Sequence, residues 1–170
     1  KAYLRSKGDS AIVPIFGKSY REAKERELNL GLDLRGGMSV TLEVSIPDLV
    51  VALADYSTNE PFRAAVNEAK SERRNSNADF ITLFGQAWSA QNTDVELWRI
   101  FHNMENRDLF PQKSTDEEIL AILRTEAETA INNTENIIRK RIDQLGVAQP
   151  NVQKLSFSGR ILVELPGIDD

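Results

Sequence analysis

The sequence predicts an α+β fold, and three patterns carry that prediction. Apolar and polar residues alternate over 28–46, which is typical of half-buried strands. Apolar residues then recur at three- and four-residue steps in several pieces up to residue 145, which is typical of amphipathic helices. Two short apolar runs after residue 150 are separated by Ser158-Gly159 and predict a hairpin.

Composition narrows the classes of function. The chain has 170 residues, 41% of them hydrophobic, and can bury a core. Its formal charge of −5 argues against a nucleic-acid binder that relies on general basicity. It contains no cysteine and one histidine, which excludes Cys/His zinc sites, thiol catalysis and iron–sulfur clusters. No apolar run is long enough to span a membrane, and no signal peptide is evident. Since the chain starts at Lys1, we expect a piece of a longer protein.

The first strands are expected to follow a polar N-terminal extension, residues 1–27. Leu28, Leu30, Leu32 and Leu34 alternate with polar residues and predict a strand. Gly36-Gly37 permits positive φ and a sharp bend. The alternation resumes over residues 39–46, where Pro47 is expected to end the strand and to open a helix.

Short helical stripes over residues 48–113 predict a helical insertion with its own aromatic core. Asn59 is a candidate N-cap, and Thr93-Asp94-Val95-Glu96 reads as a capping box for the last of these helices. Trp88 and Trp98 are expected in this core; an exposed pair would instead indicate a peptide-binding surface. The expected inward residues are Leu49, Val50, Leu53, Ala54, Phe62, Ala65, Val66, Ala69, Phe80, Ile81, Phe84, Ala87, Trp88, Leu97, Trp98 and Phe101.

The clearest predicted element is a helix from Asp116 to Leu145, roughly 45 Å long. Ser114-Thr115-Asp116-Glu117 reads as its capping box, and Gly146 is placed to cap its C-terminus. Basic residues 139–141 suit its last turns. The predicted inward stripe is Ile119, Ile122, Leu123, Ala127, Ala130, Ile131, Thr134, Ile137, Ile138, Ile142 and Leu145.

The hairpin joins residues 152–157 to residues 160–165. A simple two-residue loop would place Leu155 and Phe157 on the face opposite Ile161, Val163 and Leu165. A bulge with Gly159 at positive φ would bring all five side chains onto one face, so the sequence favours the bulged form.

The order strand, helical insertion, long helix, strand, strand predicts a partial ferredoxin-like β-α-β-β base, with the third strand between the first two. The last helix and strand of that fold would be missing, which leaves the strand over residues 39–46 with an unfilled edge. The predicted divisions are 1–27 for the extension, 28–47 for the first strands of the base, 48–113 for the helical insertion, and 114–170 for the long helix and hairpin.

No catalytic, cofactor or metal site is predicted. Asp33-Leu34-Arg35-Gly36-Gly37 could cradle an anion, but the glycines lead into a strand, which favours a structural turn. His102 has no second histidine or cysteine and is expected to be a capping or surface residue. Asp116, Glu117 and Glu118 suit the first turn of a helix.

Three ordered segments resemble the SecD and SecDF protein-export family. They are residues 30–37 with the strand that follows, residues 141–150 and residues 160–168. Residues 56–115 have no recognised counterpart. The motif residues, read as structural or interaction positions, are Asp33, Leu34, Arg35, Gly36, Gly37, Arg141, Leu145, Gly146, Glu164, Leu165, Pro166 and Gly167.

The resemblance implies a domain on the periplasmic side of the bacterial inner membrane, within an integral membrane protein. The expected partners are SecF, YajC and the SecYEG channel, and the expected role is to assist late, proton-motive-force-driven export by conformational change. Transient contact with unfolded secretory polypeptides is one expectation; a purely structural docking module is the alternative. The implied function is not enzymatic, although a site completed by missing sequence is a third possibility.

Overall fold

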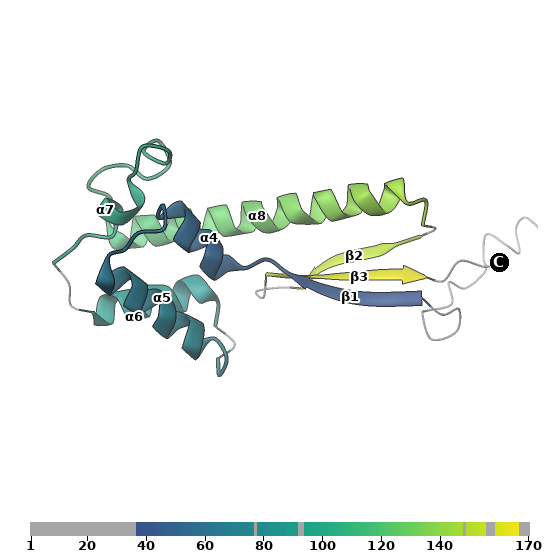
Figure 1. The fold of residues 1–170 in the computed structure, drawn as a ribbon, viewed down its shortest axis with the longest axis horizontal. Helices are drawn as coiled ribbons and strands as arrows, with labels where there is room; N and C mark the ends of the chain where they lie inside the picture. Colours follow the sequence, from purple (N-terminus) through teal and green to yellow (C-terminus); the bar gives the residue numbers. More distant parts are fainter. Residues whose placement is uncertain (1–36, 77, 92–93, 148, 156–158, 167–170) are drawn as a thin grey trace, which may run out of the picture.

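The computed structural model describes residues 37–76, 78–91, 94–147, 149–155 and 159–166. A small sheet lies at one end, a group of short helices lies at the other, and one long helix runs along both (Figure 1). The elements are β1 (Gly37–Glu43), α4 (Ile46–Leu53), α5 (Glu60–Glu72), α6 (Phe80–Ala90), α7 (Trp98–Phe101), α8 (Asp116–Gln144), β2 (Asn151–Leu155) and β3 (Arg160–Pro166).

The three strands form an antiparallel sheet in the order β1-β3-β2. This confirms the predicted α+β class and the placement of the third strand between the first two. β1 and β2 form the two edges of the described sheet. Completion of a ferredoxin-like fold stays a prediction, as do the proposed domain divisions.

The strand predicted over residues 39–46 ends earlier than predicted. β1 ends at Glu43, and Ile46 begins α4 with Pro47 next to it, so Ile46 packs into the helical core. Proline there lacks an N–H that a first helical turn does not use, which allows the helix to start early. Gly37 has φ 143, which confirms positive φ at the second glycine of the pair. Gly36 and the predicted strand over residues 28–34 lie outside the described residues.

The predicted facing of the hairpin is wrong. Val152 pairs with Val163, and Leu155 pairs with Arg160. Residues paired across antiparallel strands share a face, so Leu155 lies on the side opposite Ile161 and Val163. Val152 supplies the buried partner instead. Gly159 does have positive φ, at 68°, as predicted; Phe157 lies outside the described residues.

The short helices bury an aromatic core. Asn59 caps α5 as predicted, accepting a 3.0 Å hydrogen bond from the backbone N–H of Phe62. The Phe62 ring meets Phe84 and Phe101 edge-on, with both centroid distances 5.8 Å. Such edge contacts add about 0.5–1.5 kcal/mol each beyond area burial. This group, α4–α7 with the first half of α8, is called the helical cluster below.

The helix predicted to open at the capping box of residues 93–96 does not begin there. α7 starts later, at Trp98, and its N-cap Leu97 has no side-chain cap. The Leu97 N–H instead donates to Oδ1 of Asp116 at 3.1 Å. A carboxylate from the start of α8 therefore satisfies a donor at the start of α7, which a local pattern cannot reveal. Thr93 lies outside the described residues.

α8 is the long helix that the sequence predicts, with its capping box one residue later than predicted, at Thr115 and Glu118. Gly146 follows its end at φ 69, as expected for a C-terminal cap. Ile119, Leu123 and Ala127 pack in the helical cluster, and Ile142 packs on the sheet.

Two residues of the predicted inward stripe on α8 are exposed instead. Ile137 is 51% exposed and Leu145 is 74% exposed. The sheet covers only a narrow stripe of α8, centred on Ile138 and Ile142. Ile137 points away from that stripe, and Leu145 lies beyond the end of the helix, so both side chains remain in solvent.

Candidate functional site

The motif residues from separate parts of the chain meet at one end of the sheet. Gly37 pairs with Pro166, and Met38 pairs with Leu165. Figure 1 shows the start of β1, the end of β3 and the C-terminal end of α8 together, at the end remote from α4–α7. The structure thus pairs two motif segments in adjacent strands. Leu145 and Gly146 of the third segment directly follow the C-terminal end of α8 at the same end of the molecule.

Of the described motif residues, Glu164 makes a side-chain hydrogen bond within the sheet, whereas others are exposed. Glu164 accepts a 2.7 Å hydrogen bond from the side-chain amide of Asn151 and lies opposite Ser39 on β1. Arg141 on α8 and Leu145, the C-cap residue of that helix, are among the exposed ones. The motif residues Asp33, Leu34, Arg35, Gly36 and Gly167 lie outside the described residues.

No reaction centre emerges from the described part of the chain. It holds no group of three or more His, Asp or Glu side chains suited to a metal ion. His102 is the C-cap residue of α7, as expected. Its Nδ1 lies 2.8 Å from the Phe110 carbonyl and its Nε2 lies 3.1 Å from the Gln112 amide nitrogen. The carbonyl can only accept, so Nδ1 donates and Nε2 accepts, and both ring nitrogens are engaged.

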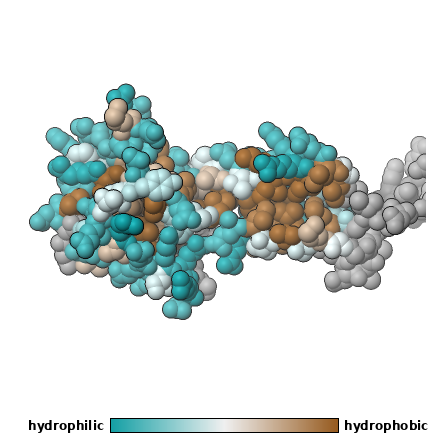
Figure 2. Space-filling model, viewed as in Figure 1, coloured by the Kyte–Doolittle hydropathy of each residue, from teal (hydrophilic) through white to brown (hydrophobic). Residues whose placement is uncertain are grey.

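β1 carries an uncovered apolar face. Met38, Val40 and Leu42 are 54%, 36% and 41% exposed. Their partners on β3 are Leu165, Val163 and Ile161, so all six side chains share the face that α8 covers over β2 and β3. Figure 2 shows the resulting hydrophobic patch over the sheet beside α8. Contiguous apolar patches of this kind mark contact surfaces.

A groove separates the sheet from the helical cluster. Its volume is about 660 Å³, and α8 contributes more of its lining residues than any other element. Its main lining residues are Ile46, Phe80, Ile81, Ala127, Ile131 and Leu155, with Arg73, Asp79, Arg124, Glu128, Asn132, Lys154 and Gly159 around them.

Ion pairs bridge the same junction. Glu43 on β1 pairs with Arg73, the C-cap residue of α5, at 2.6 Å and with Arg160 of β3 at 3.3 Å. The Val44 N–H donates to the Gly159 carbonyl at 2.9 Å. These contacts hold the end of β1 and the residue after it against both the sheet and the helical cluster.

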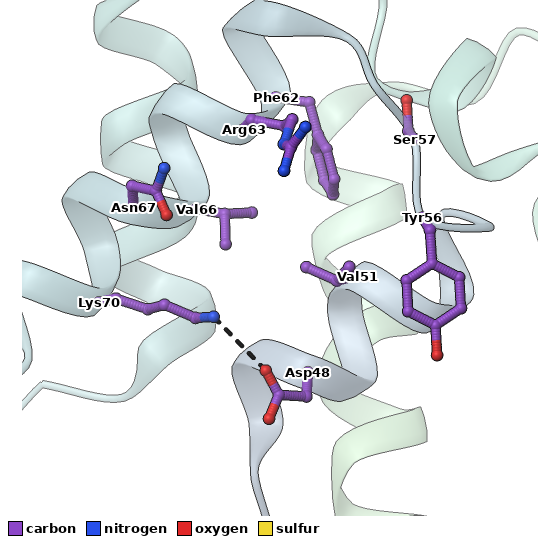
Figure 3. Close-up of a pocket in the computed structure, with 9 residues that line it drawn as sticks. All are labelled: Asp48, Val51, Tyr56, Ser57, Phe62, Arg63, Val66, Asn67 and Lys70. Atoms are coloured by element: carbon purple, nitrogen blue, oxygen red, sulfur yellow. Dashed lines mark hydrogen bonds and ion pairs between the residues drawn. The ribbon is translucent and has the colours of Figure 1, made fainter.

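A smaller pocket of about 240 Å³ lies between α4 and α5 (Figure 3). Lys70 and Asp48 meet across it at 3.4 Å, and the exposed Tyr56 ring borders it. The hydrogen bond from Ser45, helped by Lys70, holds the pKa of Asp48 below its ordinary value. This pair is solvent-exposed and contributes little to stability.

Sequence reasoning missed the apolar face of β1 and the groove. The alternation in β1 does show that its apolar residues share one face, but their exposure depends on how far α8 reaches. Ile46 and Gly159 both line the groove although they are 113 positions apart in the chain, so no local pattern marks it.

Comparison with known proteins decides the family. Residues 131–170 match the family model described as the N-terminal part of the P1 domain of protein translocase subunit SecDF, and residues 26–45 match the SecD/SecF GG motif. The chain is 40% identical over 147 residues to the protein translocase subunit SecD of Rhodothermus marinus, covering 86% of this chain and 23% of that protein. The chain belongs to the SecD family.

Other SecD proteins match at lower identity. The subunit of Escherichia coli strain K12 is 30% identical over 152 residues, covering 84% of this chain and 24% of that protein. The subunit of Acetobacter pasteurianus is 28% identical over 155 residues, covering 85% and 29%. The chain therefore spans about a quarter of the length of the curated SecD relatives it matches. No solved structure matches it.

The family matches agree with the geometry. The GG-motif match includes β1 up to Glu43, and the P1 match covers the second half of α8 with β2 and β3. These are the elements that build the sheet end of the SecD chain. Among the described helices, none is both long and apolar enough to cross a bilayer.

Proposed function

We propose that this chain is part of an extracytoplasmic domain of a SecD-type subunit that assists protein export through the Sec channel. The observation that carries the proposal is the meeting of the two family-matched segments in one sheet, with Gly37 opposite Pro166. The proposed location is the periplasmic side of the inner membrane, within an integral membrane protein. SecF, YajC and the SecYEG channel are the proposed partners.

The fold we propose for the complete base is ferredoxin-like. β1 has an uncovered apolar face and lies at an edge of the described sheet. One further helix and one further strand would cover both, as the β-α-β-β-α-β pattern requires.

The proposed mechanism needs conformational change rather than reaction chemistry. Proton movement in the membrane part would shift the balance between two orientations of the domain, and each orientation would hold an emerging polypeptide differently. Contact with unfolded chains would be transient, because it would depend on side-chain character and backbone pairing rather than on a fixed sequence.

A docking module without client contact is the second candidate. Met104, the most exposed large apolar residue of the described chain, favours it. It sits on a turn held by Asn103 and Asn106, whose side-chain amides both donate to the Leu53 carbonyl at 3.1 and 2.8 Å. A rigidly displayed apolar side chain suits a partner surface.

Export in cells tests the proposal. The full-length protein carrying Val40→Asp would replace the only SecD copy, and unprocessed secretory precursors would be measured. We expect them to accumulate, because the substitution puts a charge on the apolar face of β1, which the proposed further helix would cover. Thr41→Asp, one residue along on the opposite face, is the matched control and should leave processing unchanged. Normal processing with both variants would contradict a role for this face in export.

A further inference from the structure

The groove between the sheet and the helical cluster has the size and lining of a binding site. Its volume of about 660 Å³ falls within the usual range for ligand pockets, about 300–1,000 Å³. Phe80 and Ile81 from the first turn of α6, and Ala127 and Ile131 from α8, supply an apolar wall. Burying an apolar side chain against such a wall is favourable, because it removes apolar surface from water.

The opposite wall is the end of an edge strand. Lys154 and Leu155 of β2 line the groove, and β2 lies at the edge of the described sheet. The Val152 carbonyl points outward, because it accepts a 3.1 Å hydrogen bond from the Arg139 guanidinium. Since outward-facing backbone groups alternate along a strand, those of Lys154 face the same way. An extended polypeptide can pair with such groups whatever its sequence.

Charge on the rim defines the ligand further. Arg124 is exposed, and its guanidinium donates one 3.3 Å hydrogen bond to the Thr82 hydroxyl. The nearby carboxylate of Asp79 already accepts from the Thr82 N–H and hydroxyl. Arg124 therefore keeps donors for an acidic group on a ligand. Glu128 lies one turn further along α8, so the acid is expected on the Arg124 side.

We propose that this groove binds extended segments of unfolded polypeptide in which an apolar residue neighbours an acidic one. The apolar side chain enters between α6 and α8, the backbone follows the edge of β2, and the acidic side chain meets Arg124. This assignment rests on the proposed export function. It specifies where on the domain the secretory polypeptide binds and which of its side chains are recognised.

Peptide binding to the 170-residue chain tests the chemistry. The probe is a fluorescein-labelled, unstructured 12-residue peptide with a central Leu-Glu pair, followed by anisotropy. We expect Ile131→Glu and Arg124→Glu each to weaken binding at least tenfold. Ile137→Glu, an exposed isoleucine on the same helix, and Arg107→Glu, an exposed arginine in the loop after α7, are the matched controls and should bind normally.

A charge exchange separates binding from folding. Ile131 is partly buried and its replacement can destabilise the chain, whereas Arg124 is exposed. A peptide with Leu-Lys in place of Leu-Glu should bind Arg124→Glu better than it binds the unaltered chain. Equal binding of both peptides to both proteins, or the same loss in the two control variants, would overturn the proposal.

Photocrosslinking in the intact membrane protein tests the position. A photoreactive residue would replace Glu128 in the groove, Met38 on the β1 face or Tyr56 beside the smaller pocket, with a secretory precursor arrested in transit. Precursor crosslinks from Glu128 that Arg124→Glu removes would support the groove. Precursor crosslinks only from Met38 or Tyr56 would overturn the groove and leave client contact intact.

Two other outcomes would also overturn the groove as a polypeptide site. Crosslinks from Glu128 to lipid would show that acyl chains occupy it. An absence of precursor crosslinks from all three positions, while precursor processing still depends on the protein, would remove client contact and leave the export role standing.

Discussion

The indole Nε1 of Trp88 donates a 2.9 Å hydrogen bond to Oδ2 of Asp116, 28 positions later in the chain. The other carboxylate oxygen of Asp116 accepts from the Leu97 N–H. One side chain at the start of α8 therefore holds the end of α6 and the start of α7. It also places the acidic group where the N-terminal dipole of α8 favours it.

Asp116→Ala should destabilise the chain by about 2–4 kcal/mol, because it leaves the Trp88 and Leu97 donors without an acceptor in a largely buried place. The thermal midpoint and the near-ultraviolet circular dichroism of the tryptophans would report the loss. Glu117→Ala removes a neighbouring acid of the same first turn that is exposed, and it should cost less than about 1 kcal/mol. Equal losses would show that the bridge contributes nothing beyond the helix dipole.

Gly146 and Gly159 have nearly the same backbone angle, φ 69 and 68, but different surroundings. A Cβ at Gly146 would meet nothing within 4 Å, whereas one at Gly159 would lie 3.3 Å from the Val44 carbonyl oxygen. Gly146→Ala should cost about 1 kcal/mol for the strained φ alone. Gly159→Ala should cost more, because it also presses on the hydrogen bond between Val44 and Gly159. Denaturant unfolding of the pair measures the difference, and a larger loss at Gly146 would refute this account.

Asp79 should make the free energy of unfolding depend on pH in the acidic range. Partial burial raises the pKa of Asp79, but hydrogen bonds from Thr82 and the charge of Arg124 outweigh it and hold the pKa below its ordinary value. Because the pKa of Asp79 is lower in the folded than in the unfolded state, its ionised form stabilises the fold. This stabilisation is complete above the unfolded-state pKa, near 4, and is lost as the pH falls through the folded-state pKa. Asp79→Asn keeps a capping oxygen but cannot titrate, so its stability should fall less between pH 5 and about 2. Parallel pH profiles of the two proteins would rule the contribution out.

Gly37→Val should destabilise the sheet end, because φ 143 is a region that branched side chains essentially never adopt. The thermal midpoint should fall by several degrees, equivalent to about 1–3 kcal/mol. Met38→Val, at the next position of β1, introduces the same side chain where it is compatible with a strand and serves as the control. Unchanged melting of Gly37→Val would defeat the requirement for positive φ.

Local periodicity predicted the helices well. α5, α6 and α8 each have an apolar stripe that packs in a core, and Asn59 caps α5 as the sequence indicates. The order of the sheet also followed from the sequence, because a long crossover helix and a tight hairpin leave few ways to arrange three strands. Glu164 and Leu165 lie on the strand where the sequence placed them, whereas Gly37 and Pro166, expected at a bend and at a strand end, lie within β1 and β3.

The failures arose where distant residues decide the outcome. Leu155 and Val152 are three positions apart and cannot both face inward on a strand, and contact with Ile142 from α8 favours Val152. The cap of α7 comes from Asp116, about twenty positions away. The groove likewise depends on how α6, α8 and β2 are placed relative to one another, which the spacing of apolar residues along one element cannot specify.

Among the described helices and strands, α8 is the one that contributes buried residues to both cores. Its buried residues Ile119, Leu123 and Ala127 belong to one core, and Ile142 belongs to the other. At about 1.5 Å per residue, its 29 residues span about 43 Å. A tilt of about 10° at the sheet would therefore carry the far end through about 7 Å, while the side chains packed near Ile142 move by only a fraction of that distance. A small adjustment beside the motif residues is thereby amplified into a displacement comparable to the width of an extended polypeptide.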